Sequence, residues 1–283
     1  MQSKKNENVP RFNLSISALS LASPVPAWHV RSMRILLSND DGVHAPGLEA
    51  LFHAVKDLGE VIIAAPDSQM SAVGHAITIS DPIKVVEVNL PGGFNGYAIG
   101  GTPADCVKLA VEALLDQPPD LIVSGINLGP NAGISVIYSG TVSAATEGTI
   151  LGIPSMAVSI NTFKDPIWAT AARVARRMAQ KILSEGLPRD TLLNVNVPNV
   201  PFEELTGYEV TSMARSQFKE VFHRRTDPRG NVYYWMDGEM ELADGQSGTD
   251  VQALDTGRVS LTPLRFDLTH RDQMEFFRTN WQF

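Results

Sequence analysis

The sequence has little of what marks secreted, membrane or nucleic-acid-binding proteins. Its single cysteine, Cys106, excludes an internal disulfide and a zinc site built from cysteines. No stretch approaches the roughly 18 continuous apolar residues of a membrane span. Acidic residues outnumber basic ones by 31 to 23, and the net charge of −8 argues against nucleic acid or an anionic membrane as the main partner. We therefore expect a cytoplasmic protein with no nucleic acid polymer and no membrane as its partner.

Several common catalytic and nucleotide-binding motifs are absent as well. The sequence has no G-x-G-x-x-G after an apolar run, no G-x-x-x-x-G-K-[ST] loop, no H-E-x-x-H and no G-x-S-x-G. These absences argue against a dinucleotide-binding fingerprint, a P-loop, a zinc protease helix and a serine hydrolase elbow. Hydrophobic content of 43% in 283 residues is nevertheless ample for a large globular core.

From Met33 onward, short apolar runs alternate with helical patterns. The apolar runs that predict strands are 34–37, 61–65, 97–99, 121–124, 156–160 and 192–197. The predicted helices are 47–58, 103–115, 142–151 and 168–185, the last with apolar residues every three or four positions and basic residues between them. Apolar strands separated by helices predict an α/β fold with a doubly wound, mostly parallel sheet.

The two ends of the chain differ from this pattern. Residues 1–32 make a poor signal peptide because serines interrupt the apolar run, so we expect a flexible extension, or sequence upstream of a natural start at Met33. The core is predicted at 33–200. In the remaining segment, 201–283, "HRRTDPRGNVYYWMDGE" predicts a β-hairpin with aromatic residues on one arm, and 257–264 predicts a further strand. Such a hairpin needs a surface to pack on, and a partner subunit is one candidate.

Oxygen-bearing side chains follow three of the predicted strands. They are Asn39, Asp40 and Asp41 after the first strand, Asp67, Ser68 and Ser71 after the second, and Ser124, Asn127 and Asn131 after the strand at 121. The carboxyl ends of parallel strands share one edge of the sheet, where ligands bind. Carboxylate and neutral oxygens suit Mg²⁺, Mn²⁺ or Ca²⁺. Each group alone reads as a turn, and "SNDDG" contains a common turn signal. Their concurrence at one edge favours a cation site, although spacing alone does not select among the serines or asparagines.

A second feature is the start of the helix predicted at Val142. Tyr138, Ser139, Gly140 and Thr141 precede it, and free backbone N–H groups with hydroxyls at a helix start form an anion cradle. An N-capped helix after a loop is the structural alternative. "GTPADC" at 101–106 has the spacing of a capping box at another helix start, and we interpret it as structural. A cation site beside a phosphate cradle indicates metal-assisted hydrolysis of a phosphate ester.

Five segments in order carry a resemblance to a known family. "RILLSNDDG", "APDSQMSAVGHAIT", "GTPADCV", "SGINLGPNAG" and "YSGTVSAATEG" together resemble the SurE family of survival-protein 5′-nucleotidases. The resemblance implies a metal-dependent phosphatase that acts on nucleoside 5′-monophosphates, and in some members on 3′-monophosphates or short polyphosphate. It also implies a Rossmann-like three-layer core and a C-terminal hairpin that is exchanged between the subunits of a homodimer or homotetramer.

The resemblance also selects site residues. It implies that one Mg²⁺ or Mn²⁺ is bound by Asp40, Asp41, Ser71 and Asn127, which favours Ser71 over Ser68 and Asn127 over Asn131. We predict that Asp40 and Asn127 are catalytic. The groups predicted to orient the phosphate are Asn39, Ser139, Gly140 and Thr141. Two alternatives stay open: a nucleotide-binding module without turnover, and a phosphatase that uses Asp40 as a covalent nucleophile.

Overall fold

The structure is a computed structural model that describes residues 32–90, 93–242 and 247–281. The predicted N-terminal extension therefore lies outside the described residues, except for Ser32. Among the described helices, none combines the length and the apolar character needed to cross a membrane.

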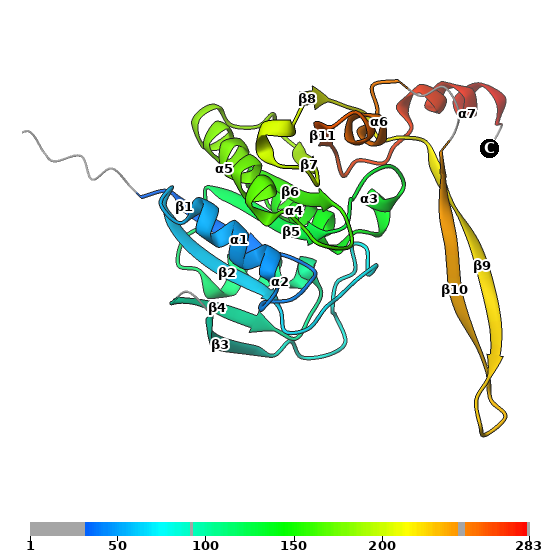
Figure 1. The fold of residues 1–283 in the computed structure, drawn as a ribbon, viewed down its shortest axis with the longest axis horizontal. Coiled ribbons are helices and arrows are strands. Elements are labelled where there is room, and N and C mark those ends of the chain that lie inside the picture. Colours follow the sequence, from blue (N-terminus) through cyan, green and yellow to red (C-terminus); the bar gives the residue numbers. More distant parts are fainter. Residues whose placement is uncertain (1–31, 91–92, 243–246, 282–283) are drawn as a thin grey trace, which may run out of the picture. The chain divides into compact units, whose positions relative to one another are not determined.

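The core is a nine-stranded sheet in the order β3-β4-β2-β1-β5-β6-β7-β11-β8 (Figure 1). Strand β3 is antiparallel to β4 and β11 is antiparallel to β7, while the other neighbours are parallel. The strands are β1 (Arg34–Ser38), β2 (Glu60–Pro66), β3 (Val85–Leu90), β4 (Phe94–Ile99), β5 (Leu121–Leu128), β6 (Ser155–Asn161), β7 (Leu192–Pro198), β8 (Gly207–Val210) and β11 (Arg258–Leu264). Each predicted strand is present, and the mostly parallel sheet is confirmed.

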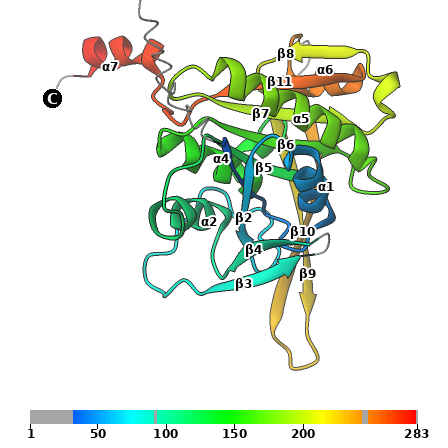
Figure 2. The same ribbon diagram turned by 90° about the vertical axis from the view of Figure 1, so that its left-hand side faces the viewer.

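Helices cover both faces of the sheet and complete three layers. Figure 2 shows α1 and α5 on one side of the strands and α2 and α4 on the other. The helices are α1 (Pro46–Val55), α2 (Pro103–Leu109), α3 (Ser135–Tyr138), α4 (Gly140–Ile150), α5 (Trp168–Glu185), α6 (Asp250–Asp255) and α7 (Met274–Asn280). Short 3₁₀ turns span Phe202–Glu204 and Arg271–Gln273. The doubly wound, Rossmann-like α/β architecture is thus confirmed.

The helix predicted at 103–115 is divided. Its α-helical part ends at Leu109, and the segment Ala110–Leu114 is a π-helical turn. The amide of Leu115 donates to the carbonyl of Ala110, five residues earlier, which is the wider spacing of a π-turn.

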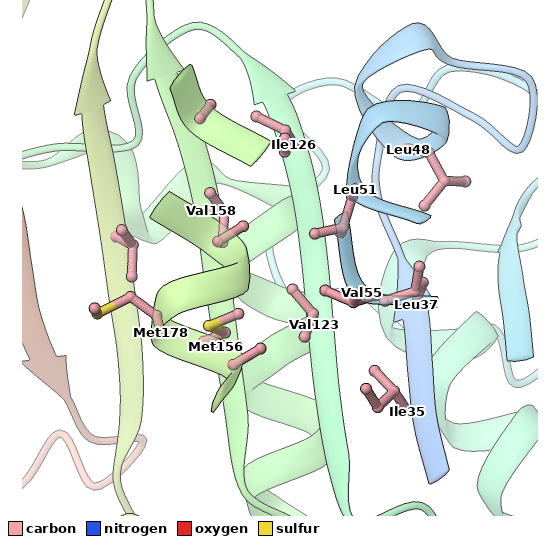
Figure 3. Packing of buried hydrophobic residues seen from close by; sticks show 14 of the residues in the cluster. Ile35, Leu37, Leu48, Leu51, Val55, Val123, Ile126, Met156, Val158 and Met178 are labelled. Carbon is pink, nitrogen blue, oxygen red and sulfur yellow. The ribbon is translucent and has the colours of Figure 1, made fainter. Parts of the chain in front are cut away.

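The core is built from alternate faces of the strands. Ile35 and Leu37 of β1 pack with α1 and α5, whereas Leu36 packs with α2 and α4, and all three side chains are fully buried. Figure 3 shows Val55 of α1 and Met178 of α5 in the first of these clusters. Burial of such a side chain stabilises the fold by about 1.5–3 kcal/mol. Both faces of the sheet are therefore apolar, and polar groups gather at the strand ends.

The C-terminal segment adds strands to the sheet and a hairpin that stands apart from it. β8 and β11 extend the sheet, whereas β9 (Ser216–Thr226) and β10 (Val232–Leu242) pair with each other in a separate two-stranded antiparallel sheet. In the turn, the carboxylate of Asp227 accepts hydrogen bonds from the amides of Arg229 and Asn231. The predicted hairpin is confirmed, and the side chains of Phe222 and Trp235 on it are 62% and 63% exposed.

Candidate active site

The segment "SNDDG" forms a tight turn directly after β1. The side-chain amide of Asn39 donates to the carbonyl of Gly42 at 2.9 Å and accepts from its amide at 3.2 Å. Gly42 has φ +100°, a backbone conformation that favours glycine. The amide of Met70 donates to the carbonyl of Asp40, which ties the turn to the loop after β2. Asn39 is fully buried and its side chain holds the turn together, so the turn fixes the position of both aspartates.

Asp40 follows β1, and its buried carboxylate lies beside the start of helix α4. The hydroxyl of Thr141 donates to its Oδ1 atom. Burial raises the pKa of Asp40 to about 6, the hydrogen bond from Thr141 acts in the opposite direction, and the negative charge of Asp41 raises it further. A cation bound here would stabilise the charged form of this carboxylate.

Asp41 and Ser71 converge on one point. The Nε2 atom of Gln69 lies 3.3 Å from Asp41 Oδ1 and 3.0 Å from Ser71 Oγ, so one side-chain amide group donates hydrogen bonds to both oxygens. The amide of Leu128 donates to Asp41 Oδ2 at 3.3 Å, and burial raises the pKa of Asp41. Two oxygens that share one hydrogen-bond donor are close enough to each other to bind the same cation.

Asn127 reaches the site because β5 continues beyond its predicted end at 124. Its pairing with β6 shifts register between Ser124 and Asn127, and such a bulge re-aims side chains near active sites. The Nδ2 atom of Asn127 donates to the carbonyl of Gly129 at 2.7 Å, and the oxygen of the same amide is the atom that would bind a cation. Ser124, by contrast, is fully buried.

Asn131 anchors the loop after β5. Its amide donates to Oδ1 of Asn196, its side chain donates to Ser159, and its carbonyl accepts from Asn194 and Asn196. These contacts tie the loop that follows Asn127 to β6 and β7. The choice of Asn127 over Asn131 as a ligand stays a prediction. It is supported by the hydrogen bonds of Asn131, because they engage its side chain within the protein.

These groups surround a single cavity of about 400 Å³. The residues predicted for the site that line it are Asp40, Asp41, Ser71, Asn127 and Ser139. Its volume is in the range of pockets that bind small molecules. Ser68 points to another contact, since its hydroxyl donates to Asp67 at 2.9 Å.

Helix α4 begins at Gly140, two positions before the start predicted at Val142. Ser139 is the N-cap, and its Oγ accepts from the amide of Val142 at 3.0 Å. Gly140 and Thr141 therefore belong to the first helical turn, beside Asp40. The N-terminal end of α4 carries the partial positive charge of the helix, which favours a phosphate at this position. The side chains of Asn39 and Thr141 are engaged within the protein, and direct contacts from them to phosphate stay predictions.

The loop that carries Ser71 is fastened to helix α4 by a contact that sequence reasoning missed. His75 Nε2 lies 2.8 Å from Oε2 of Glu147 on α4, and Lys108 on α2 donates to the other oxygen of Glu147 at 2.5 Å. The hydrogen bond from His75 is the largest cause that lowers the pKa of Glu147, and Lys108 adds to it. The sequence shows only that His75 and Glu147 have side chains able to hydrogen-bond, and nothing in their spacing predicts this contact.

The capping box at the start of α2 fastens the same loop. Asp105 accepts from the amide of Thr102, as predicted, and also from the amide and hydroxyl of Thr78 at 2.9 and 2.6 Å. The hydroxyl of Thr102 donates to the carbonyl of Ala76. The motif "GTPADC" is therefore structural, and it also positions the loop of Ser71.

The donors at the cavity fit a hard cation. No group of three or more His, Cys, Asp or Glu side chains that could hold a metal ion occurs among residues 32–90, 93–242 and 247–281. A cation here would depend on the two carboxylates together with the neutral oxygens of Ser71 and Asn127. Oxygen ligands of this kind suit Mg²⁺ or Mn²⁺ and not a soft metal.

Comparison with known proteins identifies the family. The family model described as "Survival protein SurE" matches residues 35–220. The chain belongs to the SurE family. A SurE relative from Heliobacterium modesticaldum, named 5′-nucleotidase SurE, is 48% identical over 239 residues, which cover 84% of this chain and 88% of the relative. Another of that name, from Syntrophobacter fumaroxidans, is 48% identical and covers 86% of this chain and 97% of the relative.

A solved SurE structure has the same fold. The crystal structure of the SurE protein from Aquifex aeolicus is 43% identical, with a TM-score of 0.76, and the match covers 87% of this chain and 98% of that one. The resemblance noted from the five sequence segments is thus confirmed.

Proposed function

We propose that this SurE-family chain is a 5′-nucleotidase that hydrolyses nucleoside 5′-monophosphates to nucleoside and phosphate with one divalent cation, Mg²⁺ or Mn²⁺. The observation that carries the proposal is the cavity that brings Asp40, Asp41, Ser71 and Asn127 together beside the N-terminus of α4. The names of the SurE relatives agree with this activity. Nucleoside 3′-monophosphates and short polyphosphate are further candidate substrates.

The four oxygen donors would hold the cation. When bound, the cation supplies charge neutralisation at the phosphoryl group and lowers the pKa of a coordinated water. Asp40 and Asn127 both line the cavity that would hold the phosphoryl group, which is the basis for the catalytic role proposed for both. Because Asp40 is 7% exposed and close to Thr141, its carboxylate is held in one orientation.

The start of α4 would bind the phosphate itself. Ser139 is 5% exposed and lines the cavity, and the first turn of α4 follows it directly. Backbone N–H groups at a helix N-terminus bind phosphate without a cationic side chain, and they would stabilise charge that develops on its oxygens. In this proposal Gly140 and Thr141 orient the phosphate through the backbone, and Asn39 acts by shaping the turn.

A covalent route through Asp40 is the less favoured mechanism. The hydroxyl of Thr141 donates to Oδ1 of Asp40, and Gly140 packs against the Oδ2 side of the carboxylate. Attack by water is therefore favoured over attack by this carboxylate. Release by hydroxylamine of a phosphoryl label bound to the enzyme would support the covalent route instead.

We also propose that the hairpin of β9 and β10 joins subunits into a homodimer or homotetramer. Its exposed apolar side chains, Phe222 and Trp235 among them, support this assignment. Cytoplasmic location likewise stays a prediction.

The proposal is tested by phosphate release from AMP and GMP with added Mg²⁺ or Mn²⁺. Asp40→Asn and Asn127→Ala are expected to lower kcat/KM by more than about a hundredfold, in line with loss of electrostatic groups in an active site. Asp67→Asn is the matched control, because this exposed carboxylate follows the neighbouring strand outside the cavity lining. Full activity after chelation, or in both site variants, would contradict the cation site.

A further inference from the structure

The cavity has an apolar rim that phosphate hydrolysis does not require. Phe163 and Tyr138 line it together with the predicted site residues, and their side chains are 74% and 57% exposed. Leu128 adds a third partly exposed apolar side chain to the same lining. Large apolar side chains left in contact with solvent around a polar pocket mark a place where a ligand binds.

Phe163 is backed by the loop next to Asn127. A Cβ atom on Gly129 would lie 2.3 Å from Cε1 of Phe163, so the edge of the ring rests directly on the glycine backbone. The carbonyl of Gly129 also accepts the hydrogen bond from the side-chain Nδ2 of Asn127. On either side of Phe163, the hydroxyl of Thr162 donates to the carbonyl of Lys164 and accepts from its amide. The ring is thus supported along one edge while most of its surface faces solvent.

The backbone of Tyr138 lies at the junction between α3 and α4. Tyr138 is the last residue of α3 and directly precedes Ser139, the N-cap of α4. Its carbonyl accepts from the amide of Gly74 at 3.0 Å, which ties it to the loop that carries Ser71. The backbone of Tyr138 is therefore held in place while its ring remains exposed.

We propose that Phe163 and Tyr138 form a stacking platform for the aromatic base of the nucleotide. This inference rests on the proposed function, because it places the base in the same cavity as the phosphate. An aromatic ring offers a π-face to every nucleobase, and alanine replacement of such a ring weakens binding about 5- to 150-fold. Neither ring bears a charge, so the platform selects for the presence of a base more than for its identity. The substrate class is then a nucleoside phosphate and not any phosphate monoester.

The test separates the base from the phosphate. Binding of adenosine and of inorganic phosphate is measured separately by equilibrium dialysis with Mn²⁺ present, for wild type and for Phe163→Ala. The variant is expected to weaken adenosine binding about tenfold and to leave phosphate binding unchanged. Phe163→Tyr keeps the ring and is expected to restore adenosine binding. Phe266→Ala is the matched control, since Phe266 is 40% exposed outside the cavity lining.

Turnover provides the second measurement. Phe163→Ala is expected to raise KM for AMP about tenfold with little change in kcat, and to leave KM for ribose 5-phosphate unchanged. Tyr138→Leu is expected to give the same split, and Tyr138→Phe to behave as wild type.

Each outcome decides one question. Unchanged adenosine binding in Phe163→Ala overturns the platform, and it means that another group, such as a second copy of the chain, covers the ring. Equal loss of adenosine and phosphate binding also overturns the platform, and it means that the ring only supports its loop. Failure of the wild type to release phosphate from AMP contradicts the proposed function instead. In that case adenosine binding that still depends on Phe163 would retain the base subsite.

Discussion

Gly140 lies so close to Asp40 that a Cβ atom on the glycine would stand 2.7 Å from the Cβ of Asp40. The same atom would lie 3.0 Å from Oδ2 of Asp40 and 3.0 Å from Cγ of Pro103. Helix α4 therefore starts in contact with the turn after β1, and only a residue without a side chain allows this approach. The contact joins the predicted phosphate cradle to the predicted cation site.

Replacement of Gly140 by alanine is expected to displace the Asp40 carboxylate. We expect Gly140→Ala to lower kcat/KM for AMP by more than about tenfold, because misplaced catalytic groups lose rate steeply. The melting temperature is expected to fall as well, because the higher helix propensity of alanine offsets only part of the clash with Asp40 and Pro103. Steady-state kinetics and thermal unfolding measure the two effects. Thr146→Ala on the same helix is the control, and wild-type activity in Gly140→Ala would show that the turn yields without cost.

Sequence patterns predicted the buried helices and strands well, because burial of one face or of a whole strand fixes where apolar residues occur along the sequence. β1 and α5 are examples: one is a short apolar run and the other has apolar residues at helical spacing. The edge strand β3 was missed because most of Val85–Leu90 is exposed and includes Glu87 and Asn89. Helix α3 has four residues, too few to show a period.

The site was predictable only in part. The pair Asp40 and Asp41 was visible as charge at a strand end, and parallel topology placed it beside the other strand ends. The contact of Thr141 with Asp40 joins residues 101 positions apart, and no local spacing encodes it. The register shift in β5 that carries Asn127 into the cavity depends on pairing with β6, which is likewise a tertiary effect.

Glu147 is expected to stabilise the loop of Ser71 in a pH-dependent way. Its pKa in the folded protein lies below its ordinary value of 4.5, because His75 and Lys108 hydrogen-bond to the carboxylate. Its contribution is therefore fully present above pH 4.5 and is lost as the pH falls through the lower folded pKa. Glu147→Gln is expected to lower the free energy of unfolding by about 1–3 kcal/mol at pH 7.

Urea unfolding at pH 7 and at pH 3.5 measures this effect. The difference between wild type and Glu147→Gln is expected to shrink at the lower pH. Glu185→Gln removes a carboxylate from an exposed ion pair with Lys181 and is expected to change stability by less than about 0.5 kcal/mol. A difference that stays constant between the two pH values would contradict the assignment.

Asp105 is expected to matter for both α2 and the loop. Asp105→Asn leaves the shape of the side chain but weakens its hydrogen bonds with the amides of Thr102 and Thr78 and with the hydroxyl of Thr78. We expect a loss of about 1–2 kcal/mol in the free energy of unfolding, as for loss of a helix cap. Thr78→Val tests the loop alone, and it should lower stability without affecting the cap of α2. Equal stability of Asp105→Asn and wild type would show that the loop contacts are dispensable.

The hairpin is expected to lose its partner when its apolar surface becomes charged. Phe222 lies opposite Met236 in the register of β9 and β10, and the adjacent Trp235 points to the other face, so the two side chains give both faces of the hairpin apolar surface. Burial of each large apolar side chain in an interface contributes about 1.5–3 kcal/mol to association. For the two residues together, the double variant Phe222→Glu with Trp235→Glu is expected to weaken association by more than about a hundredfold. Light scattering after size exclusion should give two or four chains for wild type and one for the double variant. Thr226→Glu adds charge at an exposed polar position of β9 and should leave the assembly intact. Phosphate release from AMP by the single-chain variant would then show whether the cavity is complete within one subunit, and a wild type that is already a single chain would contradict the assignment of the hairpin.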